Sequence, residues 1–257
     1  MPHSLQTVIR DLHRRRGRER RGLTLAEGVR LIEDALSAGI AIRGAAVSPA
    51  LEATTRGRAL KTALERDAVR LEAVTDRELA ALADTDSPQG VVALIEPRRW
   101  TWSDVRLERG AIVAALAGVQ DPGNVGTILR TALGLGAAAV VALEGTAELH
   151  NPKVVRGSMG ALFRLPAVAA RSDEFLAWAA EHGVTLWAAA ADGEPVARSA
   201  APAGPLALVV GNEGAGIAPA LAERAARRVA VPLAPGAESL NVAVATGILL
   251  HEVTRGR

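Results

Sequence analysis

The stretch that decides the fold class spans residues 111–136 and reads AIVAALAGVQDPGNVGTILRTALGLG. Its first seven residues are all apolar, which is typical of a buried strand, and turn-forming residues follow them. From Val125 onward, apolar residues recur at the i, i+3, i+4, i+7 and i+8 positions of an amphipathic helix. A buried strand that leads directly into a helix predicts a mostly parallel sheet with helices on both faces.

The same alternation continues toward the C-terminus. Further apolar runs predict strands at 138–143, 184–189, 206–210 and 228–231. Patterns with helical spacing predict helices at 123–135, 151–162, 173–182, 219–226 and 240–253. We therefore predict an α/β domain over residues 111–257, in which ligands bind beyond the carboxyl ends of the strands.

A smaller unit is predicted upstream, over residues 1–97. Helical patterns at 25–38, 49–66 and 76–83 alternate there with strand patterns at 40–47, 69–74 and 91–95. This alternation predicts a small N-terminal α/β domain. The polar residues that follow Pro97 predict a linker at 98–110.

Positive charge is concentrated at the N-terminus. The chain has a net charge of +2, and 28 of its 30 basic residues are arginine. Residues 1–22, the predicted basic arm, hold seven Arg against only Asp11 and Glu19, which gives a local charge of +5. Such a cluster predicts contacts with the phosphates of a nucleic acid. The alternative is a solvated helix face whose charges are partly paired.

The composition excludes several classes of protein. The chain has no Cys, which excludes disulfide scaffolds, thiolate metal sites and cysteine nucleophiles and fits a reducing, cytoplasmic setting. With 49% hydrophobic and 23% charged residues, it has the composition of a folded globular protein. No apolar stretch reaches the roughly 18 residues of a membrane span. We expect a soluble protein with no metal and no membrane partner.

A glycine-rich turn follows the strand predicted at 206–210. Residues 208–217 read LVVGNEGAGI, and their G-x-x-G-x-G spacing differs from the G-x-G-x-x-G of dinucleotide-binding folds. No phosphate-loop lysine follows, and no Tyr or His is placed for a dehydrogenase. Glu213 disfavours a pyrophosphate and favours a cationic or hydroxyl-rich ligand. The alternative is a plain tight turn between strand and helix.

Polar residues stand at the start of two predicted helices. In the segment VPLAPGAESLNVAVAT, residues 231–246, Ser239 is suited to cap the last helix, and Asn241 needs hydrogen-bond partners. In the first stretch, Asn124 lies where a ligand would bind, although Asp121 or Asn124 could instead be a helix cap. Arg130 could likewise be an ordinary surface cation.

Together, these segments resemble the SpoU family of RNA 2′-O-ribose methyltransferases, within the SPOUT class. The resemblance rests on three ordered motifs: D-P-x-N-x-G-x-x-x-R-T-A at 121–132, G-x-E-G-x-G at 211–216 and P-L…S-L-N-V-A-V-A at 232–245. The small-residue segment RGSMGA at 156–161 is also similar to one in the family. Upstream, AEG at 26–28 and SPQGVVA at 87–93 resemble the start and end of a ribosomal-protein-like substrate domain.

The resemblance carries expectations beyond the residues themselves. It implies a trefoil knot at the C-terminal end and a homodimer whose active site lies near the subunit interface. It implies S-adenosylmethionine as the methyl donor and RNA as the partner, with 23S ribosomal RNA favoured over tRNA because of the separate N-terminal domain. The residues at the family's catalytic positions are Asn124, Arg130, Glu213, Ser239 and Asn241. Those at its cofactor-binding positions are Gly211, Gly216, Val231 and Leu240.

Roles for these residues follow as hypotheses from the chemistry of a ribose hydroxyl, which is a very weak acid. Because a guanidinium gives up its proton reluctantly, we expect Arg130 to stabilise developing negative charge rather than to act as a base. Glu213 would hold the ribose or the Arg130 guanidinium, and the Asn and Ser side chains would orient the ribose. The alternative is a catalytically silent RNA-binding module for ribosome assembly, which the five polar residues oppose.

Overall fold

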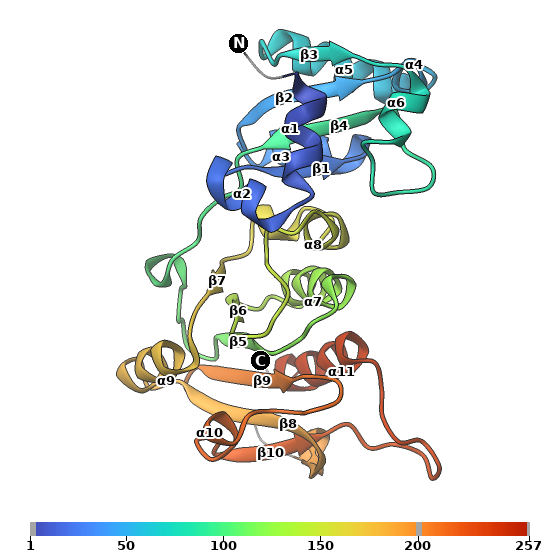
Figure 1. The fold of residues 1–257 in the computed structure, drawn as a ribbon. Helices are drawn as coiled ribbons and strands as arrows, with labels where there is room; N and C mark the ends of the chain where they lie inside the picture. Colours follow the sequence, from blue (N-terminus) through green and yellow to red (C-terminus); the bar gives the residue numbers. More distant parts are fainter. Residues whose placement is uncertain (1–3, 199–201, 256–257) are drawn as a thin grey trace. The chain divides into compact units, whose positions relative to one another are not determined.

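The computed structural model describes residues 4–198 and 202–255, which divide into two compact units (Figure 1). Unit 1 holds the described residues up to Arg98 together with His150–Phe163. Unit 2 holds the described residues of Arg99–Leu149 and Arg164–Arg257. The predicted boundaries at 1–97, 98–110 and 111–257 differ from this division in two places, since residues 99–110 lie in unit 2 and residues 150–163 in unit 1.

Unit 2 is built on a six-stranded sheet with the order β10-β8-β9-β5-β6-β7, in which every neighbouring pair is parallel. The strands are β5 (Ile112–Ala117), β6 (Ala139–Ala142), β7 (Ala167–Ala169), β8 (Thr185–Pro195), β9 (Leu206–Gly211) and β10 (Arg227–Ala230). The predicted parallel sheet is confirmed, except that β7 was not predicted because three residues are too few to form a pattern. The knot implied by the family stays a prediction.

Helices cover both faces of this sheet, as predicted (Figure 1). They are α7 (Pro122–Gly134), α9 (Ser172–Glu181), α10 (Pro219–Ala222) and α11 (Val242–Thr254). Helices α7 and α11 pack against each other on one face. On the other face, Phe175 and Trp178 of α9 and Leu221 of α10 join alternate residues of β5 in one buried core.

The segment predicted as a linker is anchored to unit 2. Trp102, in the short 3₁₀-helix η1 (Trp102–Asp104), stacks on Trp178 with ring centroids 4.6 Å apart. Val105 and Leu107 pack against the same core. The polar residues and Pro97 suggested a free connection, but the apolar area of these side chains is better removed from water.

Unit 1 has a mixed sheet with the order β1-β4-β2-β3. Its strands are β1 (Thr24–Glu27), β2 (Ile42–Val47), β3 (Leu71–Ala73) and β4 (Val91–Ile95). Its helices include α3 (Val29–Ser37), α4 (Pro49–Glu52), α5 (Thr55–Arg66), α6 (Asp76–Ala80) and α8 (Pro152–Gly157). The helix predicted at 25–38 is wrong at its start: residues 25–27 pair with β4, and Gly28, with φ of +94°, separates that strand from α3.

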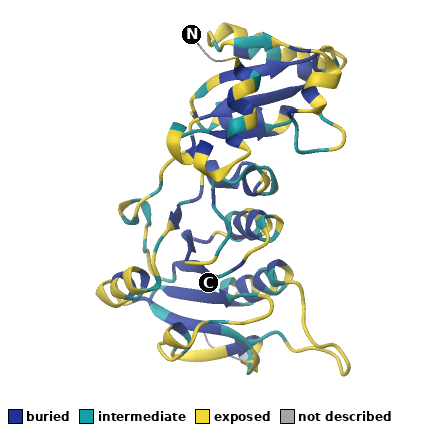
Figure 2. Cartoon of the chain, viewed as in Figure 1, coloured by how far each residue is buried: buried dark blue, intermediate teal, exposed yellow. Residues whose placement is uncertain are grey.

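The basic arm predicted at 1–22 is not a free arm; its residues 1–3 lie outside the described part of the chain. It forms α1 (Leu5–Leu12) and α2 (Arg15–Arg21), and Leu5, Ile9 and Leu12 are buried in the core of unit 1 (Figure 2). Arg18 is only 5% exposed and donates to the carbonyl oxygens of Leu12 and His13. The apolar face of α1 therefore fixes the arm to the domain.

One carboxylate ties the two N-terminal helices together. Asp11 accepts hydrogen bonds of 2.7 Å from both Arg20 and Arg21. The hydrogen bond from Arg21, which outweighs partial desolvation, and that from Arg20 hold the pKa of Asp11 below its ordinary value. Part of the predicted positive charge is thus neutralised locally.

Residues 150–163 belong to unit 1 through polar contacts. Thr24 donates to the carbonyl oxygen of His150 at 2.6 Å. Arg156 of α8 lies 2.9 Å from Asp84 and 3.7 Å from Glu27. The RGSMGA segment, which resembles one of the methyltransferase family, is therefore held by the N-terminal unit.

Candidate active site

Three polar residues that are far apart in the sequence meet at the carboxyl end of the unit 2 sheet. Asn124 lies in the first turn of α7, Glu213 follows β9, and Asn241 precedes α11. The Nδ2 atom of Asn124 donates to Oε1 of Glu213 at 2.9 Å, and Nδ2 of Asn241 donates to Oδ1 of Asn124 at 3.0 Å. The structure thus brings together three of the five residues at the family's catalytic positions.

The direction of these hydrogen bonds is set by helix α11. Oδ1 of Asn241 accepts from the backbone N–H groups of Ala243 and Val244, at 2.9 and 3.2 Å. Because backbone N–H groups can only donate, the Asn241 amide must turn its NH₂ toward Asn124. Asn124 must then turn its own NH₂ toward Glu213, whose carboxylate accepts.

Two alternatives left open by the sequence are thereby resolved. Asn241, not Ser239, is the N-cap of the last helix. Asp121 is the N-cap of α7 and accepts from the N–H of Gly123 at 2.6 Å. Asn124 is therefore not needed as a cap, and its side chain bonds to the other two motifs instead.

The loop that carries Glu213 is closed on itself. Asn212 and Gly216 exchange backbone hydrogen bonds of 2.9 and 3.0 Å, and Gly216 has a φ of +69°. The N–H groups of Gly214 and Ala215 both donate to Oδ1 of Asn212. Since a phosphate cradle needs free N–H groups, this loop is not one, in agreement with its glycine spacing.

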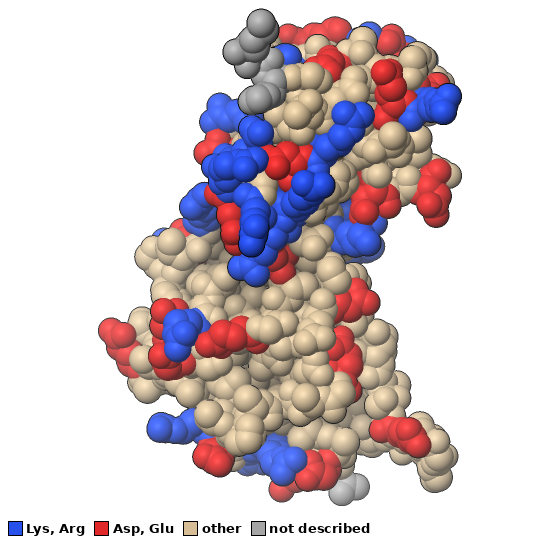
Figure 3. Space-filling model, in the orientation of Figure 1, with Lys and Arg blue, Asp and Glu red and all other residues tan. Residues whose placement is uncertain are grey.

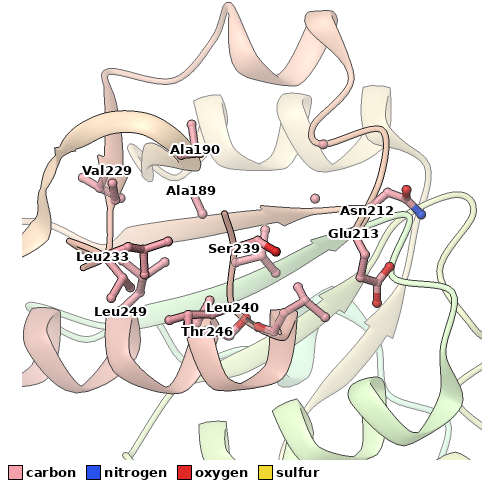
Figure 4. A pocket seen from close by; sticks show the side chains of 18 of the residues that line it. Ala189, Ala190, Asn212, Glu213, Val229, Leu233, Ser239, Leu240, Thr246 and Leu249 are labelled. Atoms are coloured by element: carbon pink, nitrogen blue, oxygen red, sulfur yellow. Dashed lines mark hydrogen bonds between the residues drawn. The ribbon is translucent and has the colours of Figure 1, made fainter. Parts of the chain in front are cut away.

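A cavity of about 300 Å³ lies beside this loop (Figure 4). The residues predicted to bind the cofactor all line it, and so do two predicted catalytic residues: Gly211, Gly216, Val231, Leu240, Glu213 and Ser239. Figure 4 shows Glu213 at the end of the cavity opposite Leu233 and Leu249. The walls are mostly apolar, and the carboxylates on them are those of Glu213 and Glu238. Such a lining fits a flat aromatic base joined to a cationic group, which is the chemistry of S-adenosylmethionine.

Three of the predicted catalytic residues do not line this cavity. Asn124 and Asn241 are linked to it through Glu213, whereas Arg130 is not. Arg130 lies six residues after Asn124 on α7, about 9 Å along the helix axis, and it is exposed. It makes no hydrogen bond or ion pair with the residues that the structure describes. Its guanidinium is therefore available to a ligand from outside this chain.

Asn212 is not among the residues predicted for the site, yet it lies next to Glu213 and on the cavity wall. Its amide makes three hydrogen bonds that hold the loop around Glu213. The signal was present, since an Asn between a strand-ending glycine and a carboxylate can donate and accept at once.

Residues 4–198 and 202–255 hold neither a cluster of metal-binding side chains nor a membrane-spanning helix. No group of three or more His, Asp or Glu side chains in these ranges could hold a metal ion. No helix there combines the length and hydropathy needed to cross a bilayer.

Comparison with known proteins relates both units to RNA-modifying enzymes. Residues 111–251 match the SpoU rRNA Methylase family, and residues 7–93 match the MRM3-like substrate binding domain. The 23S rRNA (guanosine(2553)-2′-O)-methyltransferase RlmP of Bacillus subtilis (strain 168) is 31% identical over 254 residues, which cover 95% of this chain and 93% of that protein.

Solved structures with a bound methyl donor are similar over the whole chain. The AdoMet-bound rRNA methyltransferase from Sinorhizobium meliloti has a TM-score of 0.86 and 32% identity, with 100% of this chain and 96% of the other covered. The SpoU methyltransferase AviRb from Streptomyces viridochromogenes, in complex with AdoMet, has a TM-score of 0.86 and 28% identity, with 99% and 98% covered.

Proposed function

Because this chain belongs to the SpoU rRNA methylase family, whose cofactor is S-adenosylmethionine, we propose that it methylates a ribose 2′-hydroxyl of 23S ribosomal RNA. The observation that carries the proposal is the hydrogen-bonded set Asn124–Glu213–Asn241, with Glu213 on the wall of the cavity. A catalytically silent RNA-binding module would have no need of such a directed polar set beside a cavity that fits the methyl donor.

Each polar side chain of the site has a separate role in the proposed reaction. S-adenosylmethionine, when bound, supplies a methyl group that is already activated on a sulfonium, so the chain must position the weak ribose nucleophile. Glu213 and the amides of Asn124 and Asn241 hold the ribose, and Ser239 orients it from the opposite loop. Arg130, which this chain does not bring to its own cavity, would act where the active site is completed at the proposed subunit interface. There it would bind the adjacent phosphate and stabilise the negative charge that develops on the 2′-oxygen.

The substrate is tested by mapping 2′-O-methyl groups in RNA from cells with and without the gene. We expect one or a few 23S rRNA positions to lose the modification when the gene is absent. Loss confined to tRNA would support the runner-up substrate. Unchanged RNA together with no binding of S-adenosylmethionine to the purified protein would support the silent module. The reaction is expected in the cytoplasm, which the absence of Cys also fits.

Unit 1 offers a surface for the RNA backbone. Basic side chains gather over α1 and α2 in Figure 3. Arg14 and Arg16 are exposed and have no ion-pair partner among the described residues, and Arg10 is exposed beside them on α1. Residues 1–98 hold no Phe, Trp or Tyr, and Phe163 of unit 1 is buried, so unit 1 exposes none of these rings for bases to stack on. We infer that unit 1 recognises the phosphates and shape of a folded RNA.

Changing Arg10, Arg14 and Arg16 together to Gln is therefore expected to weaken RNA binding about tenfold at ~0.1 M salt. The plot of log affinity against log salt should become shallower by roughly two to three units, because up to three phosphate contacts are lost. Fluorescence anisotropy over a salt series measures both quantities. Arg66→Gln, at an exposed position of α5, is the control and should change neither. An unchanged salt slope in the triple variant would contradict this role.

A second copy of the chain is the partner we propose for helix α11. Of the large hydrophobic side chains that are exposed in the described residues, four lie in one C-terminal region: Leu233, Leu240, Val244 and Ile248. Val244 is 52% exposed, and Ile248 lies one helical turn further along. Leu233 and Leu240 also line the cavity, so a subunit that covered this region would lie next to the site, as the family resemblance implies.

Val244→Glu combined with Ile248→Glu is expected to convert the dimer to a monomer, because charges would be buried in the interface. Sedimentation velocity or light scattering measures the mass. Ala177→Glu places a charge at an exposed position of α9 and should leave the dimer intact. A wild-type chain that is monomeric at micromolar concentration would overturn the proposal.

A further inference from the structure

A second set of hydrogen bonds holds Asn212, the residue before Glu213, and involves residues that have no assigned role. Nδ2 of Asn212 donates to the carbonyl oxygen of Gly118 at 2.9 Å. The N–H of Gly118 donates to Oγ1 of Thr146 at 3.1 Å, and Thr146 donates to the carbonyl oxygen of Leu116 at 2.7 Å. The loops that follow β5, β6 and β9 are thus bonded to one another.

We propose that Asn212 is a positioning residue for methyl transfer, which sets Glu213 against Asn124, and that Thr146 supports it through Gly118. This inference rests on the proposed function. Asn212 occupies a variable position of the G-x-E-G-x-G motif, and Thr146 lies outside the three motifs. Both act through the loop geometry rather than on the substrate.

The Asn212 amide is almost fully used by the protein itself. Its Oδ1 accepts from the N–H groups of Gly214 and Ala215, at 2.9 and 2.8 Å, which occupies both lone pairs of the oxygen. Its Nδ2 is committed to Gly118. Although Asn212 lies on the cavity wall, its oxygen has no lone pair left for a ligand, so its effect must pass through the adjacent Glu213.

The requirement is for an amide in particular. An aspartate has the same shape and keeps the two acceptor bonds, but it loses the donor and turns a negatively charged oxygen toward the Gly118 carbonyl. The loop could then relax only by moving away from Gly118. Glu213, the next residue, would move with it and leave Asn124.

Gly118 links Thr146 to Asn212, because its N–H donates to Thr146 and its carbonyl oxygen accepts from Asn212. Gly118 has a φ of +81°. The loop after β6 packs closely against it, since a Cβ atom added to Gly145 would lie only 3.3 Å from the Cα atom of Gly118. Thr146 directly follows Gly145, and this places its hydroxyl within hydrogen-bond distance of the Gly118 N–H. Loss of that hydroxyl leaves the Gly118 N–H without its acceptor.

The first test uses Asn212→Asp in the full-length protein. We expect the single-turnover methylation rate at saturating S-adenosylmethionine and RNA to fall about 30-fold, while the Kd for S-adenosylmethionine, measured by calorimetry, changes less than about threefold. In combination with Glu213→Gln, the rate should be no lower than in Glu213→Gln alone, because both changes disable the same group. Additive losses, or a rise in Kd that accounts for the lost rate, would overturn the proposal.

The second test uses the hydroxyl of Thr146. Thr146→Val, which keeps the shape, should lower the rate about fivefold, and Thr146→Ser, which keeps the hydroxyl, should restore it. Equal losses in both variants would count against the proposal.

A third readout does not depend on activity and so separates this inference from the proposed function. A crystal structure of Asn212→Asp should show the distance from Asn124 Nδ2 to Glu213 Oε1 increased beyond about 3.5 Å. An unchanged distance would overturn the positioning role even if the wild-type protein methylates RNA. A wild-type protein that methylates no RNA would refute the function and leave this geometric result standing.

Discussion

Arg130→Ala is expected to lower the single-turnover methylation rate about 1,000-fold at saturating S-adenosylmethionine and RNA, comparable to loss of a group that stabilises transition-state charge. Arg130 is exposed on α7, does not line the cavity and has no partner among the described residues. The Kd for S-adenosylmethionine, measured by calorimetry, should therefore stay within about twofold. Rapid-quench assays with saturating RNA measure the chemical step.

Arg130→Lys distinguishes a guanidinium that binds by two donors from a simple positive charge. Lysine keeps the charge but cannot form paired hydrogen bonds to a phosphate and the developing oxyanion, so we expect a loss of roughly 100-fold. Thr127→Ala, at another exposed position of α7, is the control and should keep the wild-type rate. Near-full activity of Arg130→Lys would contradict the bidentate role, and weakened binding of S-adenosylmethionine in Arg130→Ala would place the residue at the donor instead.

The meeting of Asn124, Glu213 and Asn241 could be predicted because it follows from topology. Residues that come directly after parallel strands, or begin the helices after them, share one edge of the sheet. Uninterrupted apolar runs, such as residues 206–210, predict the strands. What the pattern could not supply was the direction of the amides, which depends on Asn241 capping α11 with its oxygen.

The errors have a common physical cause, which is tertiary burial that overrides a local pattern. Residues 25–27 continue a helical spacing, yet pairing with β4 makes them a strand. Residues 98–110 look polar, yet Trp102 stacks on a tryptophan 76 positions away. The charge of residues 1–22 predicts a basic arm, but the apolar face of α1, with Leu5, Ile9 and Leu12 buried, fixes that arm to unit 1.

Asn212 was overlooked for a different reason. Its neighbours in the motif are glycines and a carboxylate, whose chemistry is evident from residue type alone. The role of Asn212 lies in partners on two other loops, Gly118 and, through it, Thr146. A single sequence gives no measure of such partners, so residues that support a site are harder to predict than residues that form it.

The glycine that ends β9 gives the second large effect, since Gly211→Ala is expected to weaken binding of S-adenosylmethionine more than 100-fold. A Cβ atom there would lie 2.3 Å from the carbonyl carbon and 2.4 Å from the oxygen of Gly216, and 2.6 Å from the nitrogen of Ile217. All three are backbone atoms, so no side-chain rotation relieves the clash, and the closed loop of residues 212–216 has to open. Opening removes one wall of the cavity and displaces Glu213.

Gly134→Ala is the matched control for this substitution. Gly134 ends α7, has no atom within 4 Å of the position of a Cβ, and is not among the glycines with positive φ. Alanine there should leave the affinity unchanged and stabilise the fold by about 0.5–1 kcal/mol. Calorimetry gives both affinities, and circular dichroism shows whether each variant is folded. A folded Gly211→Ala protein with wild-type affinity would mean that the methyl donor does not use this cavity, and the roles assigned to Glu213, Val231 and Leu240 would fail with it.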